Sequence, residues 1–199
     1  MNTKRLFDLT FSALGLIILS PFLLMIFLCI VFESGRPIIY RQKRLGKDWK
    51  EIMLYKFRTM NSQKTEDGLS CSPKNDKRIT HVGKYLRRYK LDELPQLFNV
   101  LRGDMSFVGP RPELPKFVEY YSDIYKEILK IKPGITDLAS IKFRDESSLL
   151  DCEAVDVEKV YLTKILPQKL EYSKIYLKKQ GFFYDLKLIF KTIYTVIFK

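Results

Sequence analysis

Two adjacent carboxylates, Asp92 and Glu93, lie where a helix is expected to begin, because Pro95 is tolerated in a first helical turn. Acidic residues in this position often only complement the helix dipole. Here the residues on both sides of the pair in the sequence include many cations that could bind a polyphosphate, so the two carboxylates could divide the tasks of phosphoryl transfer. One carboxylate would attack phosphorus, while the other would hold Mg²⁺ to neutralise phosphate charge. The neighbouring cations are Arg78, Arg87, Arg88, Lys90, Arg102 and Arg111.

Three further segments supply candidate phosphate ligands. Arg111 lies between two prolines in Gly109-Pro110-Arg111-Pro112, so its guanidinium is presented with little conformational entropy to lose. Lys56 and Arg58 end a β-prone run, and Arg144-Asp145-Glu146 follows the Pro133-Gly134-Ile135-Thr136 segment. Each of these signals is weak alone, since a rigid turn with a solvated arginine is common. There is no Walker loop and no G-x-G-x-x-G, so nucleotide recognition would use side-chain cations.

Composition narrows the class of protein but does not choose its partner. The 199 residues include 35 Lys+Arg against 23 Asp+Glu, a net charge of +12, and the hydrophobic fraction of 46% excludes a disordered polycation. The charge indicates an anionic partner, which could be nucleic acid, anionic lipid or a phosphorylated substrate. The three scattered cysteines and single histidine argue against a disulfide scaffold or a zinc site.

The segment from Leu9 to Phe32 near the N-terminus contains no charged side chain. As a helix, its roughly 24 residues would measure about 36 Å, which is enough to cross a bilayer. Ser20-Pro21 interrupts it near its middle, where proline removes a backbone donor and favours a bend. Basic residues flank both ends, so a re-entrant hairpin and a kinked spanning helix both fit, and a soluble core helix is disfavoured by the length.

The remaining elements predict a mainly helical α+β fold. The β-prone runs 37–42 and 52–58 flank Gly46 and predict a small β-hairpin, and no βαβ alternation is visible. Helical patterning covers 82–89, 92–101 with Gly103 as its stop, and 113–131. Residues 182–199 predict an amphipathic helix that lies either in the headgroup region or on the core. We therefore expect a membrane segment at 1–35, re-entrant or spanning, and a folded domain at 36–199.

In order along nearly the whole chain, these motifs resemble the bacterial sugar transferase family, the small single-domain monotopic phosphoglycosyl transferases that act on polyprenol phosphate. The resemblance rests on Lys4-Arg5 with Phe7-Asp8, Ser20-Pro21, Arg41-Gln42, 55–60, Arg78-Ile79-Thr80, Val82-Gly83, 91–100, 103–106, 108–112 and 133–136. It implies that residues 1–35 form a re-entrant membrane helix broken at Ser20-Pro21, and that residues 36–199 form a catalytic domain on the cytoplasmic face of the bacterial inner membrane.

The resemblance also implies a reaction and roles for residues. A phosphosugar passes from a UDP-sugar to undecaprenyl phosphate with release of UMP, through a covalent intermediate on Asp92, with Mg²⁺ on Glu93. Arg87 and Arg111 are implied as phosphate ligands, and Arg144, Asp145 and Glu146 as the nucleotide or anion end of the site. Membrane phospholipids are expected partners and nucleic acid is not; a homodimer, the sugar and the glycan pathway stay open.

Two departures from the family pattern concern the site. Lys77 replaces a frequent proline, and Asp137-Leu138-Ala139-Ser140 replaces the usual sequence after Pro-Gly-Ile-Thr, which leaves the identity of the sugar in doubt. The alternatives from other classes are a membrane-anchored nucleic-acid-binding protein and a scaffold for anionic lipid without catalysis. The nucleic-acid alternative leaves the paired carboxylates and the Pro-Arg-Pro turn without a role, and the scaffold alternative predicts binding to anionic vesicles without UMP release.

Overall fold

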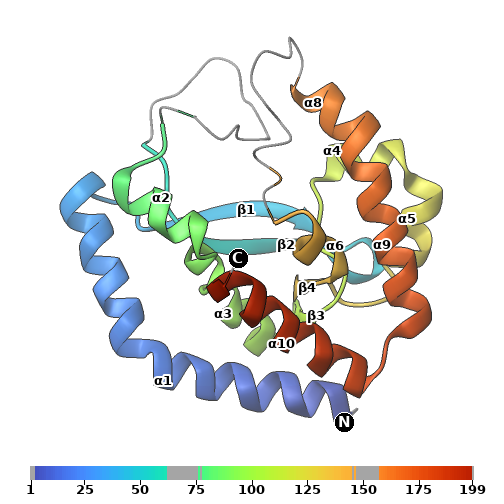
Figure 1. Ribbon diagram of the computed structural model, residues 1–199, viewed down its shortest axis with the longest axis horizontal. Coiled ribbons are helices and arrows are strands. Elements are labelled where there is room, and N and C mark those ends of the chain that lie inside the picture. Colours follow the sequence, from blue (N-terminus) through green and yellow to red (C-terminus); the bar gives the residue numbers. More distant parts are fainter. Residues whose placement is uncertain (1–2, 62–75, 77, 145, 147–156, 199) are drawn as a thin grey trace.

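The computed structural model describes residues 3–61, 76, 78–144, 146 and 157–198. Most of the predicted loop 61–76 lies outside them. The described chain is mainly helical with two small sheets, which confirms the α+β prediction (Figure 1). Its helices are α1 (Thr3–Ser34), α2 (His81–Arg88), α3 (Gln96–Arg102), α4 (Pro115–Tyr120), α5 (Ser122–Ile128), α6 (Leu138–Lys142), α8 (Val157–Val160), α9 (Leu166–Lys179) and α10 (Phe182–Phe198). Single-turn helices are η1 (Lys47–Trp49) and η2 (Leu91–Glu93), and a π-helix, η3 (Tyr161–Ile165), precedes α9.

Helix α1 is one continuous helix with Pro21 inside it, and it bends near its middle (Figure 1). Proline explains the bend because it has no N–H for the ladder, and the Ser20 hydroxyl donates to the carbonyl of Ile17 at 2.7 Å. The helix is long and apolar enough to cross a membrane, and only 11% of its most apolar stretch is buried. The expected bend is confirmed.

Both ends of α1 are bound to the rest of the protein. At the start, the Lys4 ammonium contacts Asp185 at 2.6 Å and the carbonyl of Val108 at 2.9 Å. At the end, the Arg58 guanidinium donates to the carbonyls of Ser34 and Gly35. These contacts join the first residues of α1 to β3 and α10, and its last residues to the segment after β2.

The predicted hairpin is confirmed, with β1 (Ile39–Leu45) antiparallel to β2 (Glu51–Phe57). Two backbone bonds attach it to later segments, since Leu45 N–H donates to the carbonyl of Glu113 at 3.0 Å and Asp48 N–H to that of Leu129 at 2.7 Å. The inward side chains of β2, such as Leu54, pack with Val100 and Met105 in one of the core clusters. The hairpin thereby supports both α3 and the segment that follows Arg111.

The structure corrects three details of the sequence prediction. Strands β3 (Ser106–Val108) and β4 (Gly134–Thr136) pair in parallel across α4 and α5, so a short βαβ unit exists although none was predicted. The expected helix 113–131 is two helices that part at Tyr121, whose φ of −129° is not helical. The expected helix 92–101 begins instead as η2 and continues as α3 from Gln96.

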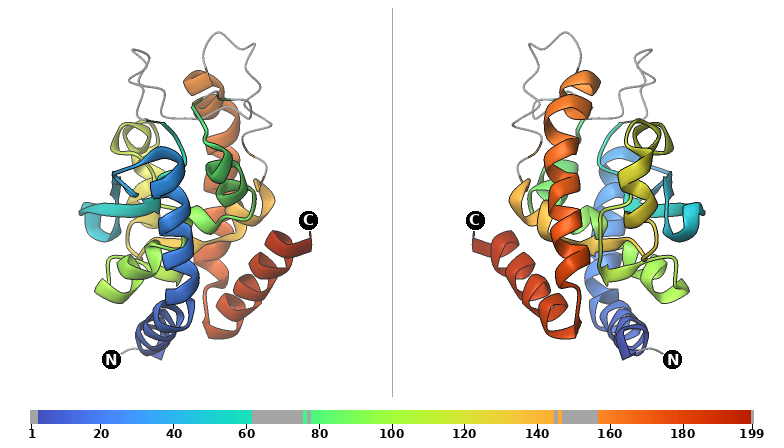
Figure 2. Two further views of the ribbon diagram at one scale, coloured as in Figure 1. Left: turned by 90° about the vertical axis from the view of Figure 1, so that its left-hand side faces the viewer. Right: turned by 90° about the vertical axis from the view of Figure 1, so that its right-hand side faces the viewer.

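Helix α10 has an exposed apolar side. Leu188 is buried in the core, whereas Phe183 is 84% and Phe190 67% exposed. Figures 1 and 2 show α10 and the N-terminal half of α1 at the same end of the molecule. The predicted amphipathic helix is therefore confirmed, and it packs on the core with one side while the other carries unpartnered apolar groups.

Candidate active site

Asp92 and Glu93 lie in η2 between α2 and α3, and both residues are 8% exposed. The sharp turn begins at Lys90, whose backbone is left-handed with φ 54°. The N–H of Glu93 closes the turn on the carbonyl of Lys90 at 3.3 Å. The two carboxylates thus do not lie in a solvated first turn of a long helix, and their burial requires charged partners.

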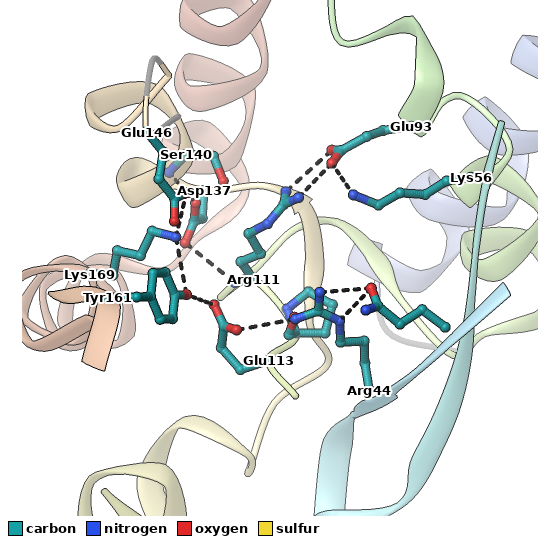
Figure 3. Close-up of polar contacts among 12 residues, drawn as sticks. Arg44, Lys56, Glu93, Arg111, Glu113, Asp137, Ser140, Glu146, Tyr161 and Lys169 are labelled. Atoms are coloured by element: carbon teal, nitrogen blue, oxygen red, sulfur yellow. Dashed lines mark hydrogen bonds and ion pairs between the residues drawn. The ribbon is translucent and has the colours of Figure 1, made fainter. Parts of the chain in front are cut away.

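Glu93 has two cationic partners. The Lys56 ammonium lies 2.8 Å from Oε1, and the Arg111 guanidinium contacts both oxygens at 2.5 and 3.3 Å (Figure 3). Burial alone would raise the pKa of Glu93, but Arg111 and Lys56 outweigh it and hold that pKa well below the ordinary value. Glu93 is therefore ionised throughout the physiological range.

The Asp92 carboxylate differs from that of Glu93 in its hydrogen bonding and in the direction in which its pKa is changed. Within the described part of the chain, its buried Oδ1 atom has no hydrogen-bond partner. Burial, with a smaller contribution from the charge of Glu93, raises the pKa of Asp92, while Lys56, Lys90 and Arg87 oppose the rise. A buried oxygen without a partner, near cations, is available to react with an electrophile.

Arg87 lies near Asp92, and Arg111 contacts Glu93. The Arg87 Nε donates to the Thr59 hydroxyl at 2.8 Å, and burial lowers the arginine's pKa while Asp92 opposes that change. Arg111 follows Gly109, which is bonded to β4 through the carbonyl of Thr136 at 3.1 Å. A Cβ on Gly109 would come within 2.4 Å of the Lys132 carbonyl, so only glycine permits this contact.

A cavity of about 650 Å³ opens beside Glu93 and Arg111. Apolar side chains of α1, α3 and α10 form much of its lining, including Phe11, Leu97 and Ile193. The polar lining residues are Lys90, Glu93, Arg111, Glu113, Thr136, Asp137, Ser140, Arg144, Glu146, Lys169, Ser173, Thr192 and Thr195. The cavity therefore joins the charged pair to an apolar region between the two helices expected at the membrane.

A second set of polar groups lies on the other side of Arg111 (Figure 3). The Tyr161 hydroxyl donates to Glu113 at 2.7 Å, and Lys169 contacts Glu146 at 2.7 Å and the Tyr161 oxygen at 3.3 Å. Arg44 pairs with the other oxygen of Glu113 at 3.2 Å. The backbone N–H of Arg111 donates to Asp137 at 3.4 Å, so this residue touches both polar groups of the cavity.

The structure thus brings Lys56, Asp92, Glu93, Arg87 and Arg111 together. Of these, Glu93 and Arg111 line the cavity, as does Glu146, whereas Asp92, Lys56 and Arg87 are not among its lining residues. Arg58 instead binds the last carbonyls of α1. Arg144 lines the cavity, but its guanidinium donates to carbonyls of Thr195 and Val196 near the end of α10. Asp145 lies outside the described residues.

Sequence reasoning missed Thr59, Glu113, Tyr161 and Lys169 as residues of the site. Glu113 had a usable signal, because it directly follows the Pro-Arg-Pro turn. Lys169 had no signal in the sequence, since it is one of several lysines in a helical stretch. Only the folded structure distinguishes it from the others, because its side chain is 9% exposed. Asp137 and Ser140 were noticed only as departures from a pattern.

The chain is similar to known proteins over its whole length. The profile of a family described as bacterial sugar transferase matches residues 1–199. A UDP-glucose:undecaprenyl-phosphate glucose-1-phosphate transferase of Klebsiella pneumoniae is 42% identical over 198 residues, which are 98% of this chain and 40% of that protein.

Two further relatives carry different sugars in their names. An undecaprenyl-phosphate galactose phosphotransferase of Salmonella typhimurium is 39% identical, over 98% of this chain and 40% of its own length. A UDP-N-acetylgalactosamine-undecaprenyl-phosphate N-acetylgalactosaminephosphotransferase of Aeromonas hydrophila is 34% identical, over 98% and 43%. The chain spans about two fifths of the length of these three relatives. On the full-length profile match and these identities, the chain belongs to the bacterial sugar transferase family.

Proposed function

We propose that the protein transfers a phosphosugar from a UDP-sugar to undecaprenyl phosphate and releases UMP. In the first step an Asp92 oxygen forms a bond to the β-phosphorus, and the bond from that phosphorus to the UMP oxygen breaks. In the second step an oxygen of the lipid phosphate attacks the same phosphorus and Asp92 leaves as a carboxylate. The observation that carries the proposal is the buried Oδ1 of Asp92, which has no hydrogen-bond partner among the described residues and lies near the cations Lys56, Lys90 and Arg87.

The cations suit a diphosphate. Lys56, Arg87, Lys90 and Arg111 carry four positive charges against the two negative charges of Asp92 and Glu93. The excess positive charge would attract an anionic donor and stabilise charge on the leaving oxygen. The names of the relatives give UDP-sugars and undecaprenyl phosphate as substrates of those proteins, which supports the same classes here.

Mg²⁺ fits the residues present, and Glu93 would hold it. Within the described residues, no three His, Cys, Asp or Glu side chains gather to bind a metal by themselves. Mg²⁺ usually takes one or two carboxylates and completes its shell with water and substrate phosphate. Among the described residues, the Oε2 atom of Glu93 has one hydrogen bond, the longer contact of 3.3 Å to Arg111, and Oδ1 of the adjacent Asp92 has none. Bound Mg²⁺ would neutralise phosphate charge.

The fastening of both ends of α1 supports a re-entrant helix at the cytoplasmic face of the bacterial inner membrane. Lys4 and Ser34 are bound to the same body of the protein, by Asp185 and Arg58 respectively. A helix whose ends are both held on one side would enter the bilayer and return at its bend. The exposed apolar side of α10 would lie among phospholipid headgroups at the same end of the molecule (Figure 2).

The reaction is tested by Asp92→Asn, with a donor that carries radiolabel in the sugar phosphate. We expect the wild-type protein to release UMP and to retain label after denaturation when the acceptor is omitted. The variant should do neither, because an amide is a poor nucleophile at phosphorus. Wild-type rates in Asp92→Asn would disprove the covalent step. Absence of UMP release from every UDP-sugar by the wild type, with binding to anionic vesicles retained, would favour the scaffold alternative.

The topology is tested separately with single cysteines at Thr3 and Lys50, both exposed, in a chain whose three native cysteines are replaced by alanine. A membrane-impermeant thiol reagent should label both positions in inside-out vesicles and neither in intact cells. If Thr3→Cys were labelled in intact cells and not in inside-out vesicles, the helix would span the membrane instead.

A further inference from the structure

The side chain of Asn99 joins α3 to the outer edge of β2. Its Oδ1 accepts the Tyr55 N–H at 3.2 Å, and its Nδ2 donates to the Met53 carbonyl at 2.7 Å. A primary amide carries the same donor and acceptor as a peptide group, so Asn99 takes the place of a third strand beside β2. Asn99 is 0% exposed, so water does not compete for these two bonds. A shift of β2 by one residue would turn both backbone groups away from the amide.

The backbone of Asn99 is held as well. Its carbonyl accepts from the N–H groups of Gly103 and Asp104 at 3.1 and 3.0 Å, and these bonds close the end of α3. Asn99 is therefore fixed both to the end of its own helix and to the neighbouring strand. The two elements keep one position relative to each other, along the strand as well as across it.

The same two elements carry the two partners of an ion pair in the reaction site. Lys56 directly follows Tyr55 in β2, and Glu93 ends η2, which leads into α3. The Lys56 ammonium lies 2.8 Å from Oε1 of Glu93 (Figure 3). The contacts form a closed loop, from Glu93 along α3 to Asn99, across the amide to Tyr55, and from Lys56 back to Glu93.

We propose that Asn99 is a positioning residue for the reaction, and that its amide sets where the Lys56 ammonium meets Glu93. The inference rests on the proposed function and deepens it, because Asn99 is not among the residues that line the cavity and would act only through Lys56. Without the amide, the Tyr55 N–H and the Met53 carbonyl lose this partner, so β2 can shift against α3 and carry Lys56 with it. A misplacement of about 1 Å at a reaction site can lower a rate by about 100-fold.

The test is a double-mutant cycle on kcat for UMP release, with Asn99→Ala, Lys56→Met and the variant that carries both changes. If Asn99 acts through Lys56, its loss matters only while Lys56 is present. We expect each single change to lower kcat by about 10-fold or more, and the double variant to match Lys56→Met. A residue that only stabilises the fold would lower kcat by the same factor in both backgrounds.

Val100→Ala is the matched control. Val100 is the next residue of α3, is fully buried, and packs with Leu54 of β2 in one core cluster. Its truncation weakens the same interface between α3 and the hairpin but leaves both hydrogen bonds of the Asn99 amide in place. We expect a lower melting temperature of Val100→Ala in detergent, with kcat close to that of the wild type.

Asn99→Gln takes the place of Asn99→Ala in the cycle if the alanine variant does not fold. Glutamine keeps the donor and the acceptor, but its extra methylene displaces them, so kcat should fall only while Lys56 is present. Equal factors in the two backgrounds would overturn the inference, as would wild-type kcat in a folded Asn99 variant or an equal loss in Val100→Ala. A wild-type protein that releases no UMP from any UDP-sugar would instead refute the proposed function.

Discussion

The guanidinium of Arg111 contacts both carboxylate oxygens of Glu93, at 2.5 Å from Oε1 and 3.3 Å from Oε2. The two residues come from separate elements, since Glu93 ends η2 and Arg111 follows β3. Both residues line the cavity, and the backbone N–H of Arg111 also donates to Asp137. Four predictions follow from the way this pair is held.

Arg111→Lys tests the two-oxygen contact itself. Lysine keeps the charge but cannot contact both oxygens of Glu93 with a planar fork, so we expect kcat/KM for UMP release to fall by about 10-fold or more. Arg102→Lys is the control, because the Arg102 side chain is 62% exposed and lies outside the cavity lining. Equal activity of the two variants would contradict a geometric role for Arg111.

Glu93→Gln tests the charge that Lys56 and Arg111 share. Removing the carboxylate leaves two cations without their anion, and loss of one partner of a buried ion pair typically costs about 3–5 kcal/mol of unfolding free energy. We expect a lower melting temperature in detergent and a weaker response of the residual activity to added Mg²⁺. An unchanged Mg²⁺ dependence would refute Glu93 as the metal ligand, whatever happens to stability.

Gly134→Ala tests the backbone contact that positions Arg111. An added Cβ would come within 2.1 Å of the Gly109 nitrogen, so β4 would be pushed away from the turn before Arg111. We expect a loss of about 1–3 kcal/mol in unfolding free energy and a fall in activity. Gly181→Ala is the control, because its Cβ would meet nothing within 4 Å. A Gly134→Ala protein as stable and active as the control would argue against this contact.

Asp137→Asn tests the pH dependence of stability. Burial raises the pKa of Asp137 above its model-peptide value of 3.8, although hydrogen bonds from Ser140 oppose the rise. The contribution of Asp137 to stability is therefore full below that value and is lost as pH rises through the folded-state pKa. Asparagine can still cap α6 but does not ionise, so the unfolding free energy of the variant relative to wild type should increase with pH.

The control for this prediction is Asp123→Asn. The pKa of Asp123 is lowered by its hydrogen bond and charge interaction with Lys126, so its pH dependence has the opposite sign. Urea unfolding in detergent at pH 4, 6 and 8 would compare the two variants with the wild type. A difference between wild type and Asp137→Asn that stays constant with pH would contradict the raised pKa.

Much of the fold could be predicted because its signals are local. The bend of α1 follows from Pro21, the hairpin from two β-prone runs around Gly46, and the end of α3 from Gly103, whose φ of 93° suits glycine. The parallel pair β3 and β4 could not be predicted, since three-residue strands have no period of their own and pair only when α4 and α5 bring them together.

By itself, the sequence determined which groups could react: the paired carboxylates Asp92 and Glu93, and the rigid Arg111. Residue types and proline geometry are written in the chain and need no partner. Only the tertiary structure decided how those groups are used, because contacts such as Glu93 with Lys56 and Arg111 join segments far apart in sequence. The tertiary structure also shows that Arg58 binds the end of α1 instead of lining the cavity, and that Lys169 lines it. Side-chain partnership depends on packing across the whole fold, so no local pattern could assign it.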